Sequence, residues 1–224
     1  MNNSNMLAKE LLIKQIPLLK LSDTGYSVLS LMEECNLKHL PVVEDGKYVS
    51  LLAERDIFAM TDMKSPIENL GRYAPYVSEE APVLEVLQLM SNDQLTLLPV
   101  VNREGIYEGA VTIPVLIEKM AELTNAGLKG AVIALELNSA DYVLSEIVRL
   151  AEANNARILS LFTYPVKATA KLVILLKIDL EDASPVLRSL ERFNFNVLYC
   201  FQKKGLINEI MKNRLEELMY YIEM

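Results

Sequence analysis

Few residues of this chain have the type and spacing that chemistry requires. The one histidine, His39, has no cysteine or histidine neighbours at the spacing of metal ligands, so a zinc site is not expected. The paired carboxylates, Glu33 with Glu34 and Glu79 with Glu80, are typical of solvated helix or loop faces. The sequence contains no glycine-rich phosphate loop, no nucleophile elbow and no His-Glu-x-x-His motif. The sequence therefore predicts a protein that is not an enzyme and carries no cofactor.

The two cysteines, Cys35 and Cys200, lie far apart, each within an apolar pattern. We interpret them as small core residues in a reducing compartment, with a disulfide as the alternative. Residues 1–5 lack the basic and apolar pattern of a signal peptide, and no apolar run is long enough for a membrane span. We therefore expect a cytoplasmic protein without a membrane partner.

Composition limits the classes of partner further. The 224 residues have a formal net charge of −8, and Lys and Arg form no cluster. Nucleic-acid affinity depends largely on such clusters, so no nucleic-acid partner is expected. The hydrophobic content of 51% is ample for packed cores, and the length favours two domains.

One stretch of the chain occurs twice. Residues 37–43 read Leu-Lys-His-Leu-Pro-Val-Val, and residues 95–101, which follow 58 positions later, read Leu-Thr-Leu-Leu-Pro-Val-Val. An internal repeat of this length indicates two copies of one supersecondary unit, each of which covers an apolar face of the other.

Each copy is predicted to fold in the order β-α-β-β-α. An extended segment precedes a helix with an apolar stripe, two short strands are joined by a glycine turn, and a second helix begins near Glu54 or Pro114. Ser22 or Asp23 is expected to cap the first helix of the first copy, and Pro82 to lie in the first turn of its counterpart.

After a linker at residues 124–127 the pattern changes to β-α-β-β-α-β, the ferredoxin-like split β-α-β. We expect Asn138 or Ser139 to cap its first helix, and Pro185 to lie at the first position of its second. The predicted strands are residues 131–137, 158–164, 171–179 and 196–202. Gly205 is expected to end this fold, and residues 205–224 to form a C-terminal helix with an apolar stripe from Ile207 to Ile222.

The paired units with their Leu-Pro-Val-Val strands resemble cystathionine-β-synthase (CBS) domains in tandem, the Bateman module. The predicted fold is thus mixed α/β (α+β). The expected boundaries are 8–64 and 65–123 for the two CBS repeats, 129–204 for the ferredoxin-like domain and 205–224 for the terminal helix.

The resemblance implies a site for an adenine nucleotide. The family often carries Gly-h-x-Thr/Ser-x-x-Asp, in which the hydroxyl meets phosphate and the carboxylate accepts from ribose hydroxyls. Residues 50–56 read Ser-Leu-Leu-Ala-Glu-Arg-Asp and residues 109–115 read Gly-Ala-Val-Thr-Ile-Pro-Val. Each copy therefore keeps half of the motif. The candidate residues implied by the resemblance are Asp56, Ser50, Lys38, His39, Thr112 and Gly109.

Purely structural roles remain open for these candidates. Asp56 and Thr112 could each cap or flank the helix that follows. Lys38 is expected to be exposed and His39 half-buried. The ligand implied by the resemblance is AMP, ATP or S-adenosylmethionine, and the alternative is a degenerate pair of sites.

The second half resembles an ACT domain, a small module that often binds amino acids. The family's usual glycine and asparagine would fall at Asp141 and Arg157, which argues for sheet-to-sheet dimerisation over amino-acid binding. CBS units followed by an ACT-like domain also resemble the acetoin-utilisation accessory proteins in architecture. We expect a homodimer or higher even oligomer. As a regulatory module it would sense an adenine nucleotide or related adenosyl metabolite and signal through contact with a regulated protein; the alternative is a structural dimerisation scaffold.

Overall fold

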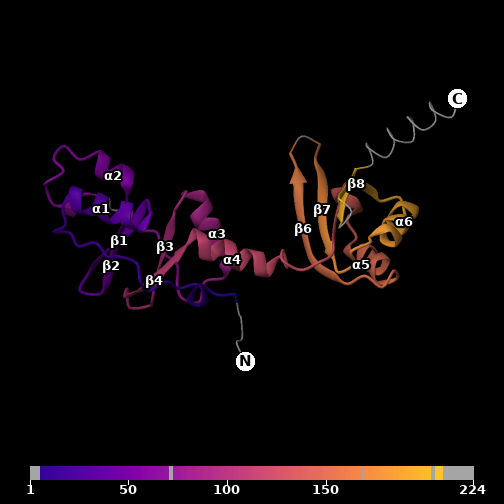
Figure 1. Ribbon diagram of the computed structural model, residues 1–224, viewed down its shortest axis with the longest axis horizontal. Helices are drawn as coiled ribbons and strands as arrows, with labels where there is room; N and C mark the ends of the chain where they lie inside the picture. Colours follow the sequence, from indigo (N-terminus) through magenta and orange to yellow (C-terminus); the bar gives the residue numbers. More distant parts are fainter. Residues whose placement is uncertain (1–5, 71–72, 168, 203–204, 209–224) are drawn as a thin grey trace. The chain divides into compact units, whose positions relative to one another are not determined.

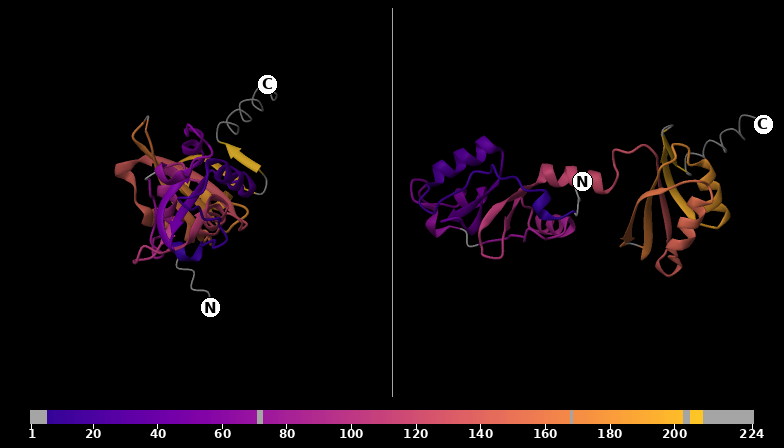
Figure 2. Two further views of the ribbon diagram at one scale, coloured as in Figure 1. Left: turned by 90° about the vertical axis from the view of Figure 1, so that its left-hand side faces the viewer. Right: turned by 90° about the horizontal axis from the view of Figure 1, so that it is seen from below.

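The computed structural model describes residues 6–70, 73–167, 169–202 and 205–208. The chain divides into two compact units, residues 1–120 and 121–224, and each is described by itself (Figures 1 and 2). The first unit contains the two repeats, and the second contains a single sheet with two helices on one face.

The two repeats have matching elements, an α-helix, a β-hairpin and a second helix. The elements of the first repeat are α1 (Gly25–Cys35), β1 (His39–Glu44), β2 (Lys47–Ala53) and α2 (Glu54–Phe58). Those of the second are α3 (Val83–Asn92), β3 (Leu97–Val101), β4 (Tyr107–Thr112) and α4 (Ile113–Leu123). Short 3-10 helices occur at Ala8–Glu10 and Ile67–Asn69. The predicted order is confirmed for these elements.

The first predicted strand of each repeat is reduced to one bridge. Leu19 bridges Val42 of β1, and Val77 bridges Val100 of β3, both in parallel. The segments approach the hairpins as the sequence predicted, but each makes only a single ladder rung. Because Pro17 and Pro75 precede these segments and lack a backbone N–H, longer pairing on that side is disfavoured.

Two predicted helix starts were wrong by one or two residues. Thr24, not Ser22 or Asp23, caps α1: its hydroxyl accepts from the Ser27 N–H, and the Ser27 hydroxyl accepts from the Thr24 N–H. The Asp23 carboxylate instead accepts from the Lys20 N–H, which closes the preceding turn. Pro82 is the N-cap of α3 in an extended conformation, so the helix begins at Val83.

The two repeats are related by matching contacts. The N–H of Tyr48 donates to the Gly105 carbonyl over 3.1 Å, and the N–H of Tyr107 donates to the Gly46 carbonyl over 3.0 Å. The apolar residues of both hairpins are buried between the elements, and this core includes Leu40, Val42, Leu51, Leu52, Leu97, Leu98, Val100 and Val111.

The second unit contains an antiparallel sheet in the order β6-β7-β5-β8-β9. Its strands are β5 (Ala131–Asn138), β6 (Ile158–Val166), β7 (Lys171–Ile178), β8 (Asn196–Gln202) and β9 (Gly205–Asn208). The helices are α5 (Leu144–Glu152) and α6 (Ser184–Arg192), after a 3-10 turn at Ser139–Asp141. The first four strands have the order that a split β-α-β predicts, so this fold class is confirmed.

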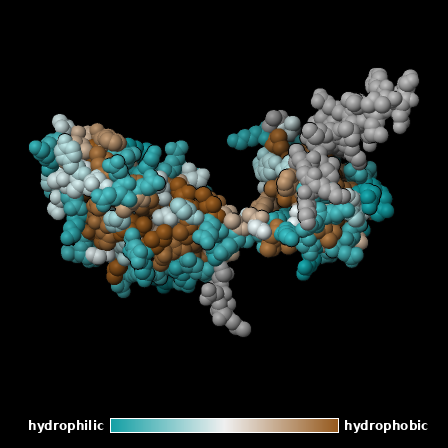
Figure 3. Space-filling view, in the orientation of Figure 1, coloured by the Kyte–Doolittle hydropathy of each residue, from teal (hydrophilic) through white to brown (hydrophobic). Residues whose placement is uncertain are grey.

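Alternate residues of the strands form the core against α5 and α6. Ile133 and Leu135 of β5 and Ile174 and Leu176 of β7 are fully buried in one cluster with the helices. The opposite face carries Phe162, Tyr164 and Phe201, which are 39%, 47% and 54% exposed. Figure 3 shows that apolar side chains reach the surface of both units.

The prediction for the end of the chain was partly wrong. Gly205–Asn208 is not the start of a helix but a strand that pairs antiparallel with β8. The edge of β8 offers unpaired backbone groups, and pairing satisfies them, which overrides the local helical pattern. The rest of the predicted terminal helix, residues 209–224, lies outside the described residues. The helix α5 also begins later than expected, with Val143 at its N-cap.

Candidate functional site

Asp56 occupies the first turn of α2, directly after β2. Its Oδ2 accepts a hydrogen bond of 3.0 Å from the N–H of Ala53, the residue that precedes the helix. This contact is the carboxylate half of a capping box; Ala53 has no hydroxyl to supply the other half. Asp56 is half-buried, and its Oδ1 makes no hydrogen bond within the described part of the chain. One oxygen therefore fixes the side chain and the other can accept from a ligand.

Lys38 and His39 lie at the start of β1, beside the same helix. His39 is the direct partner of Ala53 across the hairpin, and the Lys38 carbonyl accepts from the Glu54 N–H over 2.9 Å. Lys38 is exposed and His39 half-buried, as the sequence predicted. The hairpin thus brings Lys38 and His39 beside the first turn of α2, which carries Asp56.

Thr96 joins this group from the second repeat and was not predicted. Its N–H donates to Nδ1 of His39 over 3.2 Å, its Oγ lies 3.0 Å from the same nitrogen, and its Oγ accepts from the Lys38 N–H over 3.2 Å. The repeat itself held the signal, because Thr96 stands 58 positions after Lys38 at the equivalent place. Comparison of the two copies could have identified it.

Thr112 lies at the same end of the second hairpin. It is the last residue of β4, it pairs across the hairpin with Leu97, and it is 5% exposed. The following residue, Ile113, donates its N–H to the Thr96 carbonyl over 3.3 Å. Thr112 therefore lies at the end of one hairpin and Asp56 in the helix that follows the other, and Thr96 and His39 connect these two hairpin ends.

Ser50 and Gly109 are not part of this group. Both are buried farther along their strands, where Ser50 pairs with Val42 and Gly109 with Val100. A Cβ at Gly109 would lie 2.9 Å from the carbonyl oxygen of Ile13. The glycine thus permits close packing of the chain's own N-terminal segment, which hydrogen bonds to Ala110.

The electrostatics of the group centre on His39. Burial lowers the pKa of the imidazole below its usual value, and the positive charges of Arg55 and Lys38 act in the same direction. The carboxylates of Asp56 and Glu54 oppose this shift without reversing it. His39 is therefore neutral at pH 7.

A cavity of about 390 Å³ adjoins the group between α1 and α2. Lys38 and Glu54 are its charged residues nearest to the candidate site, and Phe58, which is 67% exposed, forms part of its wall. Of the six predicted site residues, only Lys38 lines it. Its volume is in the range of small-molecule pockets.

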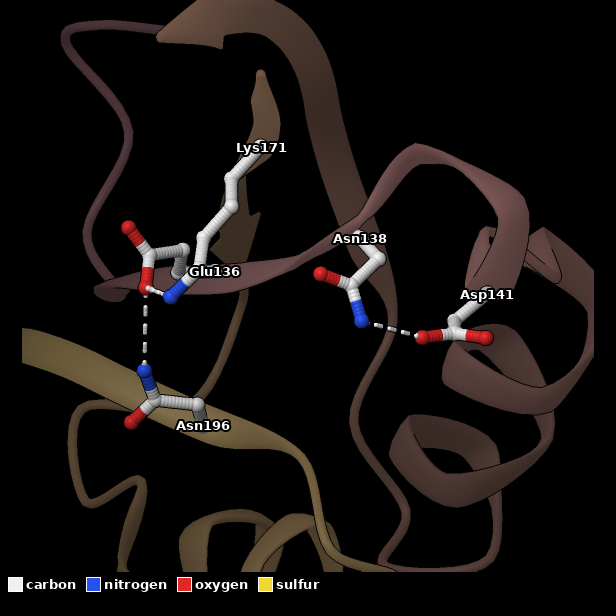
Figure 4. Close-up of polar contacts among 5 residues, drawn as sticks. All are labelled: Glu136, Asn138, Asp141, Lys171 and Asn196. Carbon is white, nitrogen blue, oxygen red and sulfur yellow. Dashed lines mark hydrogen bonds and ion pairs between the residues drawn. The ribbon is translucent and has the colours of Figure 1, made fainter. Parts of the chain in front are cut away.

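The second unit has a polar cavity of about 400 Å³ at the end of β5. Figure 4 shows Glu136 of β5 between Lys171 and Asn196, whose side-chain nitrogens lie 2.6 and 3.3 Å from its Oε2. The Asn138 amide donates to Asp141 over 2.8 Å. With Glu146, the lining carries three carboxylates and one lysine, whose ammonium already contacts Glu136. This arrangement does not favour the carboxylate of an amino acid.

Arg157, the other position that the ACT resemblance singled out, lies elsewhere. Its N–H and its Nε each donate to the Asp179 carboxylate over 2.8 Å. These hydrogen bonds lower the pKa of Asp179. Among the residues that the structure describes, no three His, Cys, Asp or Glu side chains group as metal ligands. Within that same part of the chain, no helix is long and apolar enough to cross a membrane.

Two stretches of the chain, residues 8–60 and 65–122, match the family model for the CBS domain. The chain therefore contains a tandem pair of CBS domains, as the sequence predicted. CBS domains are generally regulatory, non-catalytic modules.

A curated relative is inosine-5'-monophosphate dehydrogenase from Methanocaldococcus jannaschii, 27% identical over 108 residues. The match covers 47% of this chain and 22% of the enzyme, so the chain spans about a fifth of that relative's length.

The solved structures that are similar to this chain include the following three. A CBS domain pair/ACT domain protein from Thermotoga maritima is 24% identical, with a TM-score of 0.48 over 52% of this chain and 98% of that one. CBSX2 in complex with AMP is 17% identical, with a TM-score of 0.48 over 53% and 98%. The cytosolic domain of the Mg²⁺ channel MgtE in complex with ATP is 23% identical, with a TM-score of 0.46 over 52% and 49%.

Proposed function

We propose that this chain is a non-catalytic regulatory module whose CBS pair binds an adenine nucleotide or a related adenosyl metabolite. CBS pairs typically bind adenosine ligands in regulatory roles. The observation that carries the proposal for this chain is the half-buried carboxylate of Asp56, which Ala53 fixes through one oxygen while the other remains open. A fixed acceptor of this kind suits the diol of a ribose.

The first repeat supplies the groups that would contact such a ligand. Asp56 accepts from ribose hydroxyls, and Lys38 is an exposed cation that can approach a phosphate. Ala53 offers no hydroxyl donor in the first repeat, and Val115 leaves the second without a ribose acceptor. With Lys38 as its phosphate contact and no hydroxyl at Ala53, the first repeat favours ligands that rely little on phosphate, such as adenosine or AMP.

Calorimetry with AMP and adenosine tests this assignment. Asp56→Ala removes the ribose acceptor and should weaken binding about thirtyfold to a hundredfold, which corresponds to roughly 2–3 kcal/mol. Thr112→Ala is the matched variant in the second repeat and should change the affinity for adenosine little. Equal losses in both variants, or unchanged binding by Asp56→Ala, would rule out the assignment.

A thermal-shift panel with AMP, ADP, ATP, S-adenosylmethionine, NAD and amino acids identifies the ligand class. A ligand at a hundred times its dissociation constant stabilises the folded state by about 2.7 kcal/mol, which a melting experiment detects. If no adenosine compound shifts the melting midpoint, the scaffold function is favoured instead.

We further propose that the chain forms a homodimer or higher even oligomer and signals through contact with a regulated protein. The support for self-association is the outer face of the second unit's sheet, where Phe162, Tyr164 and Phe201 are exposed. Large apolar side chains exposed on a sheet face are typical of interaction surfaces. The same face supports the alternative function, a dimerisation scaffold with degenerate ligand sites.

A further inference from the structure

The chain's one histidine connects the two repeats through a hydrogen bond that its neutral form accepts. The N–H of Thr96 donates to Nδ1 of His39 over 3.2 Å. A ring nitrogen that accepts from an N–H carries no proton, so the proton of neutral His39 resides on Nε2. The imidazolium form carries a proton on both nitrogens and leaves the Thr96 N–H without this acceptor.

Thr96 makes further contacts that depend on the same position. Its hydroxyl lies 3.0 Å from Nδ1 and accepts from the Lys38 N–H, and its carbonyl accepts from the Ile113 N–H at the start of α4. A proton on Nδ1 would face the Thr96 N–H, and the hydroxyl would have to turn its lone pair toward the ring. Movement of Thr96 would therefore affect both the β1 end of the first repeat and the α4 end of the second.

The charges around the ring come from the start of β1 and the first turn of α2. Arg55 and Lys38 disfavour a second positive charge at His39, whereas Asp56 and Glu54 favour it. Burial adds to the first effect, and the balance lowers the pKa of His39. Protonation at mildly acidic pH therefore removes the acceptor of the Thr96 N–H. It also places a positive charge in a half-buried position near Arg55 and Lys38.

We propose that the contact between His39 and Thr96 is a pH-sensitive joint between the two CBS repeats. Neutral His39 helps to hold the ends of the two hairpins together, and its protonation weakens their contact by removing the acceptor of the Thr96 N–H. Because Lys38 and Asp56 belong to the same group, protonation also lowers affinity for the ligand at this site. This effect on ligand affinity rests on the proposed function, whereas the pH-sensitive contact between His39 and Thr96 does not.

NMR spectroscopy of the full chain tests the joint directly, because a single histidine needs no assignment. We expect the Nε2–H tautomer at pH 7.5 and a titration midpoint below 6.5, the ordinary value of the side chain. An Nδ1–H tautomer, or a midpoint at or above 6.5, would overturn the proposal.

A matched pair of variants separates the charge from the hydrogen bond. His39→Asn places an amide oxygen near the position of Nδ1 and does not titrate, whereas His39→Leu removes the acceptor. Between pH 7.5 and 5.5 the melting midpoint of the parent should fall about 3 °C more than that of His39→Asn, as for the loss of one hydrogen bond. His39→Leu should be less stable than the parent at pH 7.5. Parallel curves for parent and His39→Asn would contradict the joint.

The ligand arm measures affinity for AMP at both pH values in the parent and in His39→Asn. The phosphate of AMP titrates equally in both experiments, so it cancels in the comparison. The parent should lose about fivefold more affinity at pH 5.5 than the variant does. An equal loss would remove the regulatory part of the proposal. If the parent binds no adenosine compound, the proposed function fails while the NMR and melting results still decide the joint.

Discussion

Tyr48 and Tyr107, which occupy equivalent places in the two repeats, exchange matching backbone hydrogen bonds across the repeats. Each donates its N–H to the turn glycine of the other hairpin, Tyr48 to Gly105 over 3.1 Å and Tyr107 to Gly46 over 3.0 Å. Lys47 and Ile106 form an antiparallel bridge at the same place. The repeats therefore meet at the turn end of the hairpins as well as at the His39–Thr96 end.

The turn glycines at this junction should be sensitive to substitution. Gly46 and Gly105 have φ angles of +79° and +82°, with open space where a Cβ would lie. The cost of Gly105→Ala is therefore conformational, about 1–2 kcal/mol in denaturant unfolding. Gly46→Ala should cost a similar amount because the turns are equivalent. Gly127→Ala, at a glycine with open space and no positive φ, is the control and should change stability little. A stable Gly105→Ala variant would contradict the strain argument.

The cap of α1 provides a second test of stability. Thr24→Ala removes the hydroxyl that accepts from the Ser27 N–H, and should lower the free energy of unfolding by about 1 kcal/mol. Ser22→Ala, two residues earlier at an exposed position, should leave it within about 0.5 kcal/mol of the parent. Urea unfolding monitored by circular dichroism distinguishes the two variants. Equal losses of unfolding free energy would show that Thr24 is not the cap.

The two cysteines should react at different rates. Burial raises the pKa of Cys200 to about 11, with a contribution from the charge of Asp182, and the side chain is 1% exposed. Roughly one such thiol in a thousand is ionised at pH 8, and the thiolate is the reactive form. Peptide mapping after brief exposure to iodoacetamide should find Cys35, which is half-buried, modified at least about tenfold faster. Equal labelling of the folded protein would show that β8 opens readily.

The oligomeric state can be measured directly. The chain has a mass of 25.2 kDa, and we expect light scattering at micromolar concentration to give at least twice this value. Phe162→Asp places a charge on the outer face of the sheet and should reduce the mass toward that of a monomer. Arg188→Asp on the exposed side of α6 is the control and should retain the parent's mass. A parent mass of 25.2 kDa would contradict self-association.

Sequence periodicity predicted most elements because their local signals agree with their environment. The Leu-Pro-Val-Val strands of both repeats are buried as their apolar runs indicated, and strand β8 has the predicted bounds, Asn196–Gln202. The sheet order of the second unit also followed, since a β-α-β-β-α-β chain has few ways to bury two helices on one face. The helix predicted from Gly205 was wrong for Gly205–Asn208, because pairing with the edge of β8 outweighed the helical pattern.

The residues of the candidate site were predictable from the sequence, but the contacts between them were not. The sequence by itself determined the repeat, the acceptor at Asp56 and the missing hydroxyl at Ala53, because these depend only on residue type and position. Only the tertiary structure decided that Thr96 meets His39, and that Gly109 packs against Ile13. Such contacts join residues far apart in the chain, and their geometry depends on how the two hairpins pack, which no local pattern records.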